Sequence, residues 1–164
     1  MSPDERPVVV AYDGSDEAQE ALRTAAALFS GRTLLVVSVW EPGLALAMAT
    51  TPDLSGLTYM PPSVEEAAMV DRAQRDHAAD TASAGAALAR ELGARAEPLS
   101  VPDEVDIAET IASLADRSNA CAVVVGSRGL GRIKSRMLGS TSQEMLRRAD
   151  CPLLVVKAPR KEAP

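Results

Sequence analysis

Residues 121–142 read CAVVVGSRGLGRIKSRMLGSTS, in which an apolar run, residues 121–125, leads directly into a glycine-rich loop. The spacing of that loop is G-x2-G-x9-G-S, and the residues that define it are Gly126, Gly129, Gly139 and Ser140. Glycines that follow a strand and precede a new helix let backbone N–H groups approach an anion, because glycine has no side chain to hold the anion away. The stretch therefore predicts a buried strand followed by a phosphate-binding loop.

Two better-known glycine loops do not fit these residues. Gly126 and Gly131 are spaced as in a P-loop, but Arg132 and Ile133 stand where Lys and Ser/Thr would reach the outer phosphates and Mg²⁺. A dinucleotide fingerprint needs G-x-G-x-x-G after the first strand and an acidic residue about twenty positions later. The chain has neither of these features, so both loop types are excluded.

The N-terminal part of the chain predicts a strand, a helix and a second strand. Residues 6–12 form a β-rich run that ends at the turn Asp13-Gly14-Ser15, and residues 33–40 form a second apolar run. Between them Ser15 is the expected N-cap of a helix and Gly31 its stop. Apolar residues recur there at helical spacing, namely Ala18, Ala21, Leu22, Ala25, Leu28 and Phe29. Such a βαβ unit predicts two parallel strands.

The rest of the chain continues the alternation. Residues 41–63 hold four prolines and predict a long irregular loop. The elements expected after it are a helix over 64–92 closed by Gly93, a polar edge strand over 95–101, a helix starting at Pro102 with Asp103 or Asp106, the strand over 121–125, a helix over about 140–149, a last strand from Pro152 to Val156 and a frayed tail from Ala158. The apolar face of the helix after Pro102 is Ile107, Ile111, Leu114 and Ala115.

Most strand runs are apolar on successive residues, which is typical of strands covered by helices on both faces. The predicted class is therefore α/β, a doubly wound sheet of five parallel strands. At 164 residues the chain predicts one domain spanning 1–164. Because only 2% of its residues are aromatic, the core is expected to consist of Val, Leu, Ile and Ala.

The charge and the apolar pattern of the chain limit the classes of partner that it can bind and the compartment in which we expect it. The net charge of −6 argues against a general nucleic-acid or membrane-surface binder. Four of the 17 bases nevertheless lie in the glycine loop, which has no acid: Arg128, Arg132, Lys134 and Arg136. With no 18-residue apolar run and no charged-then-apolar leader, we expect a cytoplasmic chain. Cys121 and Cys151 are interpreted as buried thiols, and a disulfide between them stays open.

The glycine spacing, the start VVVAYDGS at residues 8–15 and the ending CPLLVV at residues 151–156 together resemble the universal stress protein family, in its ATP-binding subgroup. The resemblance spans nearly the whole chain in the order of its elements. It implies the strand order 3-2-1-4-5, which reverses between strands 1 and 4, and ligands of such sheets lie outside the carboxyl ends of the strands at that reversal. Asp13 and Gly126 are then expected to flank one crevice.

The resemblance also implies ATP, with Mg²⁺, as the ligand. It assigns the phosphates to the backbone of the three loop glycines and to the hydroxyl and N–H of Ser140, with Thr141 and Ser142 completing the helix N-terminus. Arg128 and the other loop bases either attract the phosphates or face solvent. Asp13 matches the acidic residue near the ribose or the cation, and Ala11 and Val39 match the positions that bracket adenine. Bulky residues at Gly126 or Gly139 are expected to abolish ATP binding and leave the fold nearly intact.

The family pairing implies a homodimer through the last strand, and the downstream protein partner stays unknown. No nucleophile–base pair is visible around the single histidine, so no catalytic residue is assigned and the chain is interpreted as a binding protein. Slow ATP hydrolysis through a metal at Asp13 stays open. Enzymes of related fold that cleave ATP between the α and β phosphates carry S-G-G-x-D-S after strand 1, where this chain has Tyr-Asp-Gly-Ser-Asp at 12–16.

Each functional interpretation has a plainer alternative. The glycine loop could be a tight connection in a nucleotide-free interaction module, and Asp13 could only cap the first helix or shape an Asx-turn. Tyr12 is assigned equally to base stacking and to packing. Trp40 and Tyr59 are expected to pack under the long loop. His77, among charged neighbours, is expected on a solvated face.

Overall fold

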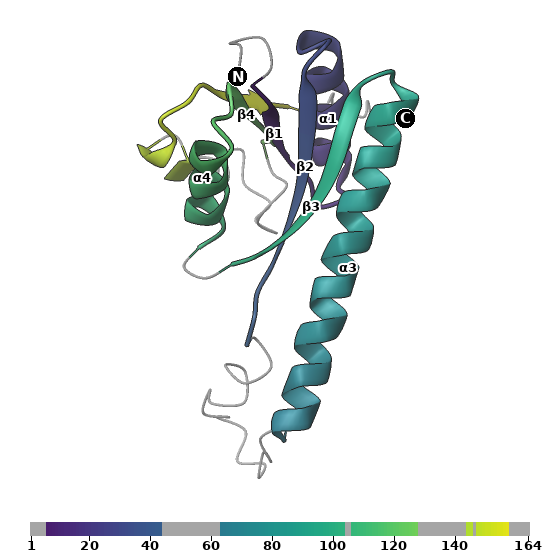
Figure 1. Cartoon of the computed structure of the whole chain (residues 1–164), viewed down its shortest axis with the longest axis vertical. Helices are drawn as coiled ribbons and strands as arrows, with labels where there is room; N and C mark the ends of the chain where they lie inside the picture. Colours follow the sequence, from purple (N-terminus) through teal and green to yellow (C-terminus); the bar gives the residue numbers. More distant parts are fainter. Residues whose placement is uncertain (1–5, 44–62, 104–105, 128–143, 146, 158–164) are drawn as a thin grey trace, which may run out of the picture.

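Five parallel strands form one sheet in the order β3-β2-β1-β4-β5 (Figure 1). Figure 1 shows the computed structural model, which describes residues 6–43, 63–103, 106–127, 144–145 and 147–157. The strands are β1 (Val8–Ala11), β2 (Thr33–Trp40), β3 (Arg95–Pro102), β4 (Ala122–Gly126) and β5 (Leu153–Val156). The helices are α1 (Asp16–Leu28), α3 (Val64–Glu91) and α4 (Ile107–Arg117), and residues 144, 145, 147 and 148 are also helical. The predicted class, strand order and parallel pairing are confirmed.

Side chains of β1 alternate between two buried layers. Val8 and Val10 pack with apolar residues of α1 and α3, whereas Val9 and Ala11 pack with residues of α4 and with Met145. Successive residues of a strand point to opposite faces of its sheet, so an unbroken apolar run needs a helix layer on each side. The central strand is therefore buried on both faces, and we call the two layers the α1/α3 core and the α4 core.

Both ends of α1 follow from its sequence. Ser15 is the N-cap, and its Oγ accepts a hydrogen bond from the backbone N–H of Ala18 at 3.1 Å. After the helix, Gly31 has φ of +85°, a conformation that favours glycine. Phe29 packs against the α1/α3 core, but the side chain of Leu28 is 63% exposed. Leu28, the last residue of α1, therefore shares the helical spacing of the buried residues without being buried itself.

β3 is an edge strand, as its polar residues predicted, but it is longer than expected. Pro102 is its last residue and lies in register with Trp40 of β2, so Pro102 does not begin the next helix. The backbone N–H of Asp103 donates to the carbonyl of Trp40 at 2.7 Å, which extends the pairing by one residue. Asp106 is the N-cap of α4, and its Oδ1 accepts from the N–H of Glu109 at 2.8 Å.

The helix α3 starts with a capping box, and its fully buried residues all lie in its second half. The Ser63 hydroxyl accepts from the N–H of Glu66, and the Glu66 carboxylate accepts from the N–H of Ser63. These bonds lower the pKa of the Glu66 carboxyl. The buried residues of α3 are Ala78, Ala82, Gly85, Ala86 and Ala89, and its first turns extend past the strands (Figure 1). In the described parts of the chain, no helix combines the length and apolarity needed to cross a membrane.

Gly85 lets α3 lie directly on the sheet. A Cβ atom built at Gly85 would stand 2.7 Å from Cδ1 of Tyr12 and 2.8 Å from Cγ1 of Val36. Both neighbours are buried in the α1/α3 core, and carbon atoms at these distances clash. The glycine therefore makes room for the Tyr12 ring between α3 and the sheet.

Gly85→Ala is expected to lower the free energy of unfolding by about 1–3 kcal/mol, the usual cost of overpacking a core. The sign is informative because alanine in a helix is otherwise about 1 kcal/mol more favourable than glycine. Ser83→Ala, at an exposed position of the same helix, is the control and should leave the stability within about 0.5 kcal/mol. Urea unfolding followed by circular dichroism measures both variants, and a Gly85→Ala protein more stable than the parent would contradict the packing.

Candidate functional site

β1 and β4 pair at the point where the strand order reverses. Val10 of β1 is in register with Val124 of β4, so the carboxyl ends of both strands lie at one edge of the sheet. The chain leaves β1 toward β2 and β3, and leaves β4 toward β5, so the connections at this edge run in opposite directions. In open α/β sheets this switch point is where ligands bind. The structure thus brings the turn at Asp13 and the end of β4 at Gly126 to one edge, as predicted.

The turn after β1 is shaped by the side chain of Asp13. Asp13 is exposed, and its Oδ1 accepts a hydrogen bond from the backbone N–H of Ser15 at 3.0 Å. Gly14 between them has φ of +80°. This is the Asx-turn that sequence analysis gave as the plainer role of Asp13. A carboxylate has about four acceptor sites, so the turn leaves this group able to bind a cation or a hydroxyl.

Tyr12 is a core residue, so of the two roles that sequence analysis left open the structure shows packing. Its side chain is 6% exposed and belongs to the α1/α3 core, with its ring against Gly85. Burial, and then the nearby charge of Asp13, raise the pKa of the Tyr12 hydroxyl. The backbone N–H of Tyr12 donates to the carbonyl of Val37 at 2.8 Å, which continues the β1–β2 pairing past the end of β1.

The two residues assigned to the adenine side lie on the opposite face from Tyr12. Ala11 is buried in the α4 core, and Val39 is half-buried against the same core. Ala11 is the last residue of β1 and is in register with Val37 of β2, and Val39 lies two residues further along β2. The structure therefore brings these two residues together on the α4 side of the carboxyl edge.

Gly126 has a packing role that sequence analysis missed. A Cβ atom at Gly126 would stand 2.9 Å from the carbonyl carbon of Glu17 and 3.0 Å from its oxygen. These are backbone atoms in the first turn of α1, so they cannot move aside as the end of a side chain would. The expectation that a bulky residue here leaves the fold nearly intact is wrong, because β4 passes directly beneath α1. A glycine at a strand end under a helix was the available signal.

Six other residues of the predicted site lie outside the described residues: Arg128, Gly129, Gly139, Ser140, Thr141 and Ser142. Tyr59 and most of the loop over 41–63 lie outside them as well. Ser127 is the last described residue before the loop. It is buried, and its N–H donates to the carbonyl of Val156 at 2.7 Å, so the β4–β5 pairing fixes the chain where the loop begins.

The remaining sequence candidates are placed as follows. His77 is exposed on α3, as expected, and Trp40 is half-buried at the end of β2. Cys121 and Cys151 are half-buried free thiols, so the disulfide alternative is not formed in this structure. Burial is the main cause that raises the pKa of the Cys151 thiol, which keeps it protonated and unreactive at neutral pH.

A divalent cation at this edge would depend on few protein ligands. Within residues 6–43, 63–103, 106–127, 144–145 and 147–157, no three His, Cys, Asp or Glu side chains gather to hold a metal. Mg²⁺ is usually bound by one or two carboxylates, several waters and the phosphates of a substrate. Asp13 at the strand end fits that pattern for a phosphate-bound ion, and it does not fit a site made of protein ligands alone.

Comparison with known proteins identifies the family. The model of the universal stress protein family matches residues 5–157 of this chain. The chain belongs to this family. A universal stress protein of Thermus aquaticus is 34% identical over 154 residues, which are 93% of this chain and 98% of the relative.

Solved structures of the family share the fold. The universal stress protein of Archaeoglobus fulgidus matches with a TM-score of 0.64 and 27% identity, over 92% of this chain and 98% of the other. A structure of the A. fulgidus universal stress protein in complex with dAMP matches with a TM-score of 0.61 and 25% identity, over 92% and 97%. The sheet described above is therefore that of the universal stress proteins.

Proposed function

We propose that this chain is an ATP-binding stress-response or signalling protein of the cytoplasm that holds the nucleotide at the carboxyl edge of β1 and β4. The observation that carries the proposal is the β1–β4 pairing, because it brings Asp13 and the loop that begins at Gly126 to one edge. The dAMP complex of the A. fulgidus protein supports an adenine nucleotide as the ligand.

The proposed contacts divide the nucleotide into two halves. Ala11 and Val39 contact adenine on the α4 side of the edge. The phosphates are held by the backbone of Gly126, Gly129 and Gly139 and by the helix N-terminus at Ser140, Thr141 and Ser142, with Arg128 adding positive charge. N–H groups at a helix start and the helix dipole both favour an anion.

Asp13 has two compatible roles in this proposal. Its Oδ1 shapes the turn by accepting from the Ser15 N–H, and the carboxylate charge faces the cation or the ribose. A bare carboxylate beside phosphates is repelled unless a divalent ion lies between them. Mg²⁺ bound jointly by Asp13 and the phosphates would remove that repulsion, so ATP is proposed to bind with Mg²⁺.

Isothermal titration of the purified protein with ATP in the presence of Mg²⁺ tests the proposal. Binding heat is expected, and native mass spectrometry should detect nucleotide that copurifies with the protein. Absence of heat and of any thermal shift at millimolar ATP would favour a nucleotide-free interaction module of the same fold. Phosphate release during the titration would instead indicate slow hydrolysis, and release of AMP and pyrophosphate would indicate cleavage between the α and β phosphates.

Ser140→Asp is expected to lower ATP affinity more than tenfold, because a carboxylate then occupies the position proposed for a phosphate. Aspartate is as good an N-cap as serine, so the free energy of unfolding should stay within about 0.5 kcal/mol. Titrations with ATP and with adenosine show whether the loss concerns the phosphates. Because adenosine carries no phosphate, it should bind equally to the parent protein and to the Ser140→Asp variant. Unchanged ATP affinity would place the phosphates elsewhere.

Two substitutions separate the turn-shaping role of Asp13 from its charge. Asparagine keeps an oxygen that accepts from the Ser15 N–H, so Asp13→Asn should retain stability within about 0.5 kcal/mol and still weaken Mg²⁺–ATP binding about tenfold or more. Asp13→Ala should lose both, with a loss of about 1 kcal/mol in stability from the broken turn. If the Asp13→Asn protein binds Mg²⁺–ATP as tightly as the parent protein, the Asp13 carboxylate only shapes the turn and does not contribute its charge to binding.

The proposal includes a homodimer through β5. β5 is the last strand in the sheet order, and an uncovered edge strand is a template for pairing with another chain. The N–H groups of Val123 and Ser127 donate to the carbonyls of Pro152 and Val156. Because main-chain groups alternate sides along a strand, those of Val155 face away from β4 and toward a second copy.

Val155→Pro therefore removes an N–H that the β4–β5 pairing does not use, and it is expected to yield a monomer. Val155→Ala loses a similar amount of packing but keeps the N–H, so it should remain dimeric. Light scattering measures both variants against twice the 17.2 kDa mass of one chain. A dimeric Val155→Pro protein, or a parent protein that is monomeric at every concentration, would rule out pairing through β5.

A further inference from the structure

The sheet has two outer edges, and they differ in composition. β3 and β5 are the two end strands of the sheet order, and an end strand with free main-chain groups is a template for pairing with another chain. β3 contains two prolines, Pro98 and Pro102, and proline has no N–H to donate. Whether these prolines affect pairing depends on which side of β3 their main-chain groups face.

Two hydrogen bonds show which way the main chain of β3 faces. The N–H of Asp103 donates to the carbonyl of Trp40 in β2 at 2.7 Å. The carbonyl of Ala96 instead accepts from Nη2 of Arg90 in α3, also at 2.7 Å. Because main-chain groups alternate sides along a strand, the odd-numbered residues of β3 face β2 and the even-numbered residues face outward. Both prolines are even-numbered, so the N–H groups that they lack are outward ones.

The outward residues of β3 are Ala96, Pro98, Ser100 and Pro102, and we call them the β3 edge. Every second one of them has no N–H, and the carbonyl of Ala96 already accepts from Arg90. A strand that pairs with an edge needs donors and acceptors at successive outward positions. Proline is accordingly found on edge strands with its missing N–H turned to solvent. An added strand could therefore form only isolated hydrogen bonds with the β3 edge.

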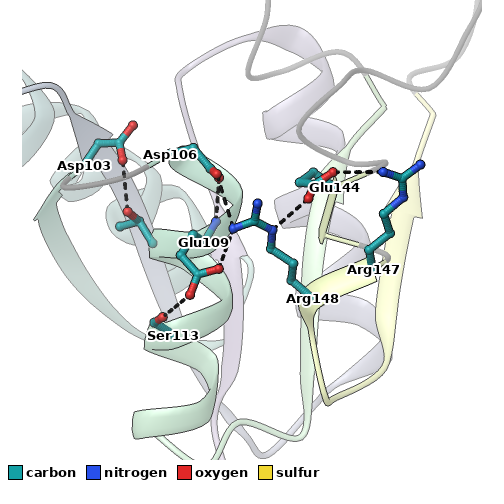
Figure 2. Close-up of polar contacts among 8 residues, drawn as sticks. Asp103, Asp106, Glu109, Ser113, Glu144, Arg147 and Arg148 are labelled. Carbon is teal, nitrogen blue, oxygen red and sulfur yellow. Dashed lines mark hydrogen bonds and ion pairs between the residues drawn. The ribbon is translucent and has the colours of Figure 1, made fainter.

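The register of β3 is held at both of its ends. A slip of one residue would turn the prolines toward β2 and remove donors from the β2–β3 pairing. At the amino end, Nη2 of Arg95 donates to the carbonyl of Gly31, which precedes β2. At the carboxyl end, Oδ1 of Asp103 accepts from the hydroxyl of Thr110 in α4 at 3.2 Å (Figure 2). The prolines are thereby kept on the outward side.

The start of α4 is joined in turn to the last described helical segment by Arg148 (Figure 2). Nη1 of Arg148 lies 2.7 Å from Oε2 of Glu109 and 3.4 Å from Oδ2 of Asp106, the N-cap of α4. Its Nε lies 2.8 Å from Oε1 of Glu144, on the same segment as Arg148. This segment leads into β5, so the carboxyl end of β3 is connected through α4 to the opposite end of the sheet.

The outer edge of β5 is not interrupted by proline. The carbonyls of Pro152 and Val156 accept from N–H groups along β4 and just after it, so the even-numbered residues of β5 face β4. Leu153 and Val155 face outward, and each has an N–H. Of the two end strands of the described sheet, β5 therefore offers donors at successive outward positions and β3 does not.

We propose that the β3 edge is closed to strand pairing, because its two prolines remove outward donors and Arg90 occupies the carbonyl of Ala96, so that this chain assembles through its sheet into pairs and no further. The closed edge is independent of the proposed function, whereas the limit to pairs rests on the homodimer proposed through β5. A chain with two open edges would use one for each neighbour and form filaments of undefined length. With the β3 edge closed, pairing through β5 uses the open edge of both copies.

Restoring the two missing N–H groups tests the closed edge. In the double variant Pro98→Thr/Pro102→Thr every outward residue of β3 can donate, and threonine is favoured in strands. Sedimentation velocity should show species larger than two chains that grow with concentration, while the parent protein should show none. Glu97→Thr is the matched control, because it places threonine in the same strand at a position that faces β2. It should sediment as the parent protein does, and growth of Glu97→Thr as well would overturn the role of the outward N–H groups.

The same substitutions in the Val155→Pro background separate the closed edge from the proposed homodimer. If Val155→Pro is monomeric, adding the two threonines should give a dimer formed through β3. If the homodimer through β5 fails, the parent protein is itself monomeric, and the same dimer is expected on adding the threonines alone. An unchanged mass in a folded variant overturns the closed edge in either case.

The part assigned to Arg90 has its own test. Arg90→Ala, added to the two threonines, frees the carbonyl of Ala96 and should lower the concentration of half-association about twofold or more. An unchanged value would overturn the contribution of Arg90.

Hydrogen exchange locates the new contact. The amides of Ala96 and Ser100 should exchange more slowly in the double variant as its concentration rises, and they should not respond to concentration in the parent protein. Unchanged exchange at these amides in a larger species would place the contact elsewhere and overturn the proposal.

A reciprocal pair of prolines tests the direction of the main chain without any assembly. Ser100 faces outward, so Ser100→Pro should keep the β2–β3 pairing, whereas Val101→Pro removes an N–H that faces β2. Val101→Pro is expected to lower the melting temperature by about 10 °C more than Ser100→Pro. This comparison is valid even if the double variant fails to fold. Equal losses would contradict the assignment of the outward residues and with it the closed edge.

Discussion

The pairing of β1 with β4 is the constraint on which the rest of the structure depends. β1 has valines on successive positions and is buried on both faces, so it is stable only between two strands and under two helix layers. With β2 on one side, β4 occupies the other, and the order of the sheet reverses between β1 and β4. The ends of these strands are thereby brought together, and with them the Asp13 turn and the start of the glycine loop.

In this core, which has few aromatic side chains, glycine allows close contact between helix and sheet at two points. Alanines and Gly85 make the buried face of α3, and Gly126 of β4 lies against the backbone of Glu17 in α1. Such close contact leaves little room for rearrangement, because interiors are packed without space for an added methyl group. The scaffold beneath the carboxyl edge is therefore closely packed, and the proposed ligand contacts come from turns and helix ends at that edge.

The fold was predictable because local and global signals agree. Apolar runs, the Ser15 cap and the Gly31 stop each indicate the element that forms. Individual side-chain contacts between distant segments were not predictable: periodicity shows that Tyr12 and Gly85 lie in a strand end and a helix, but not that the Tyr12 ring fills the space beside Gly85. The Arg148 contacts likewise join residues 39 positions apart, and no spacing in the sequence indicates them. The sequence predicted that Asp13 and Gly126 lie at the same edge of the sheet. It did not predict that Gly126 packs against α1.

Paramagnetic broadening of backbone amide resonances by Mn²⁺–ATP tests the central claim most directly, because Mn²⁺ takes the place of Mg²⁺ and broadens signals only nearby. The account predicts broadening at Gly14, Ser15 and Ser127, at the carboxyl ends of β1 and β4. It predicts none at Gly31 or Asn119, which precede β2 and β4 at the opposite edge. Broadening at that opposite edge, or no selective broadening at all, would contradict a nucleotide site where β1 and β4 end.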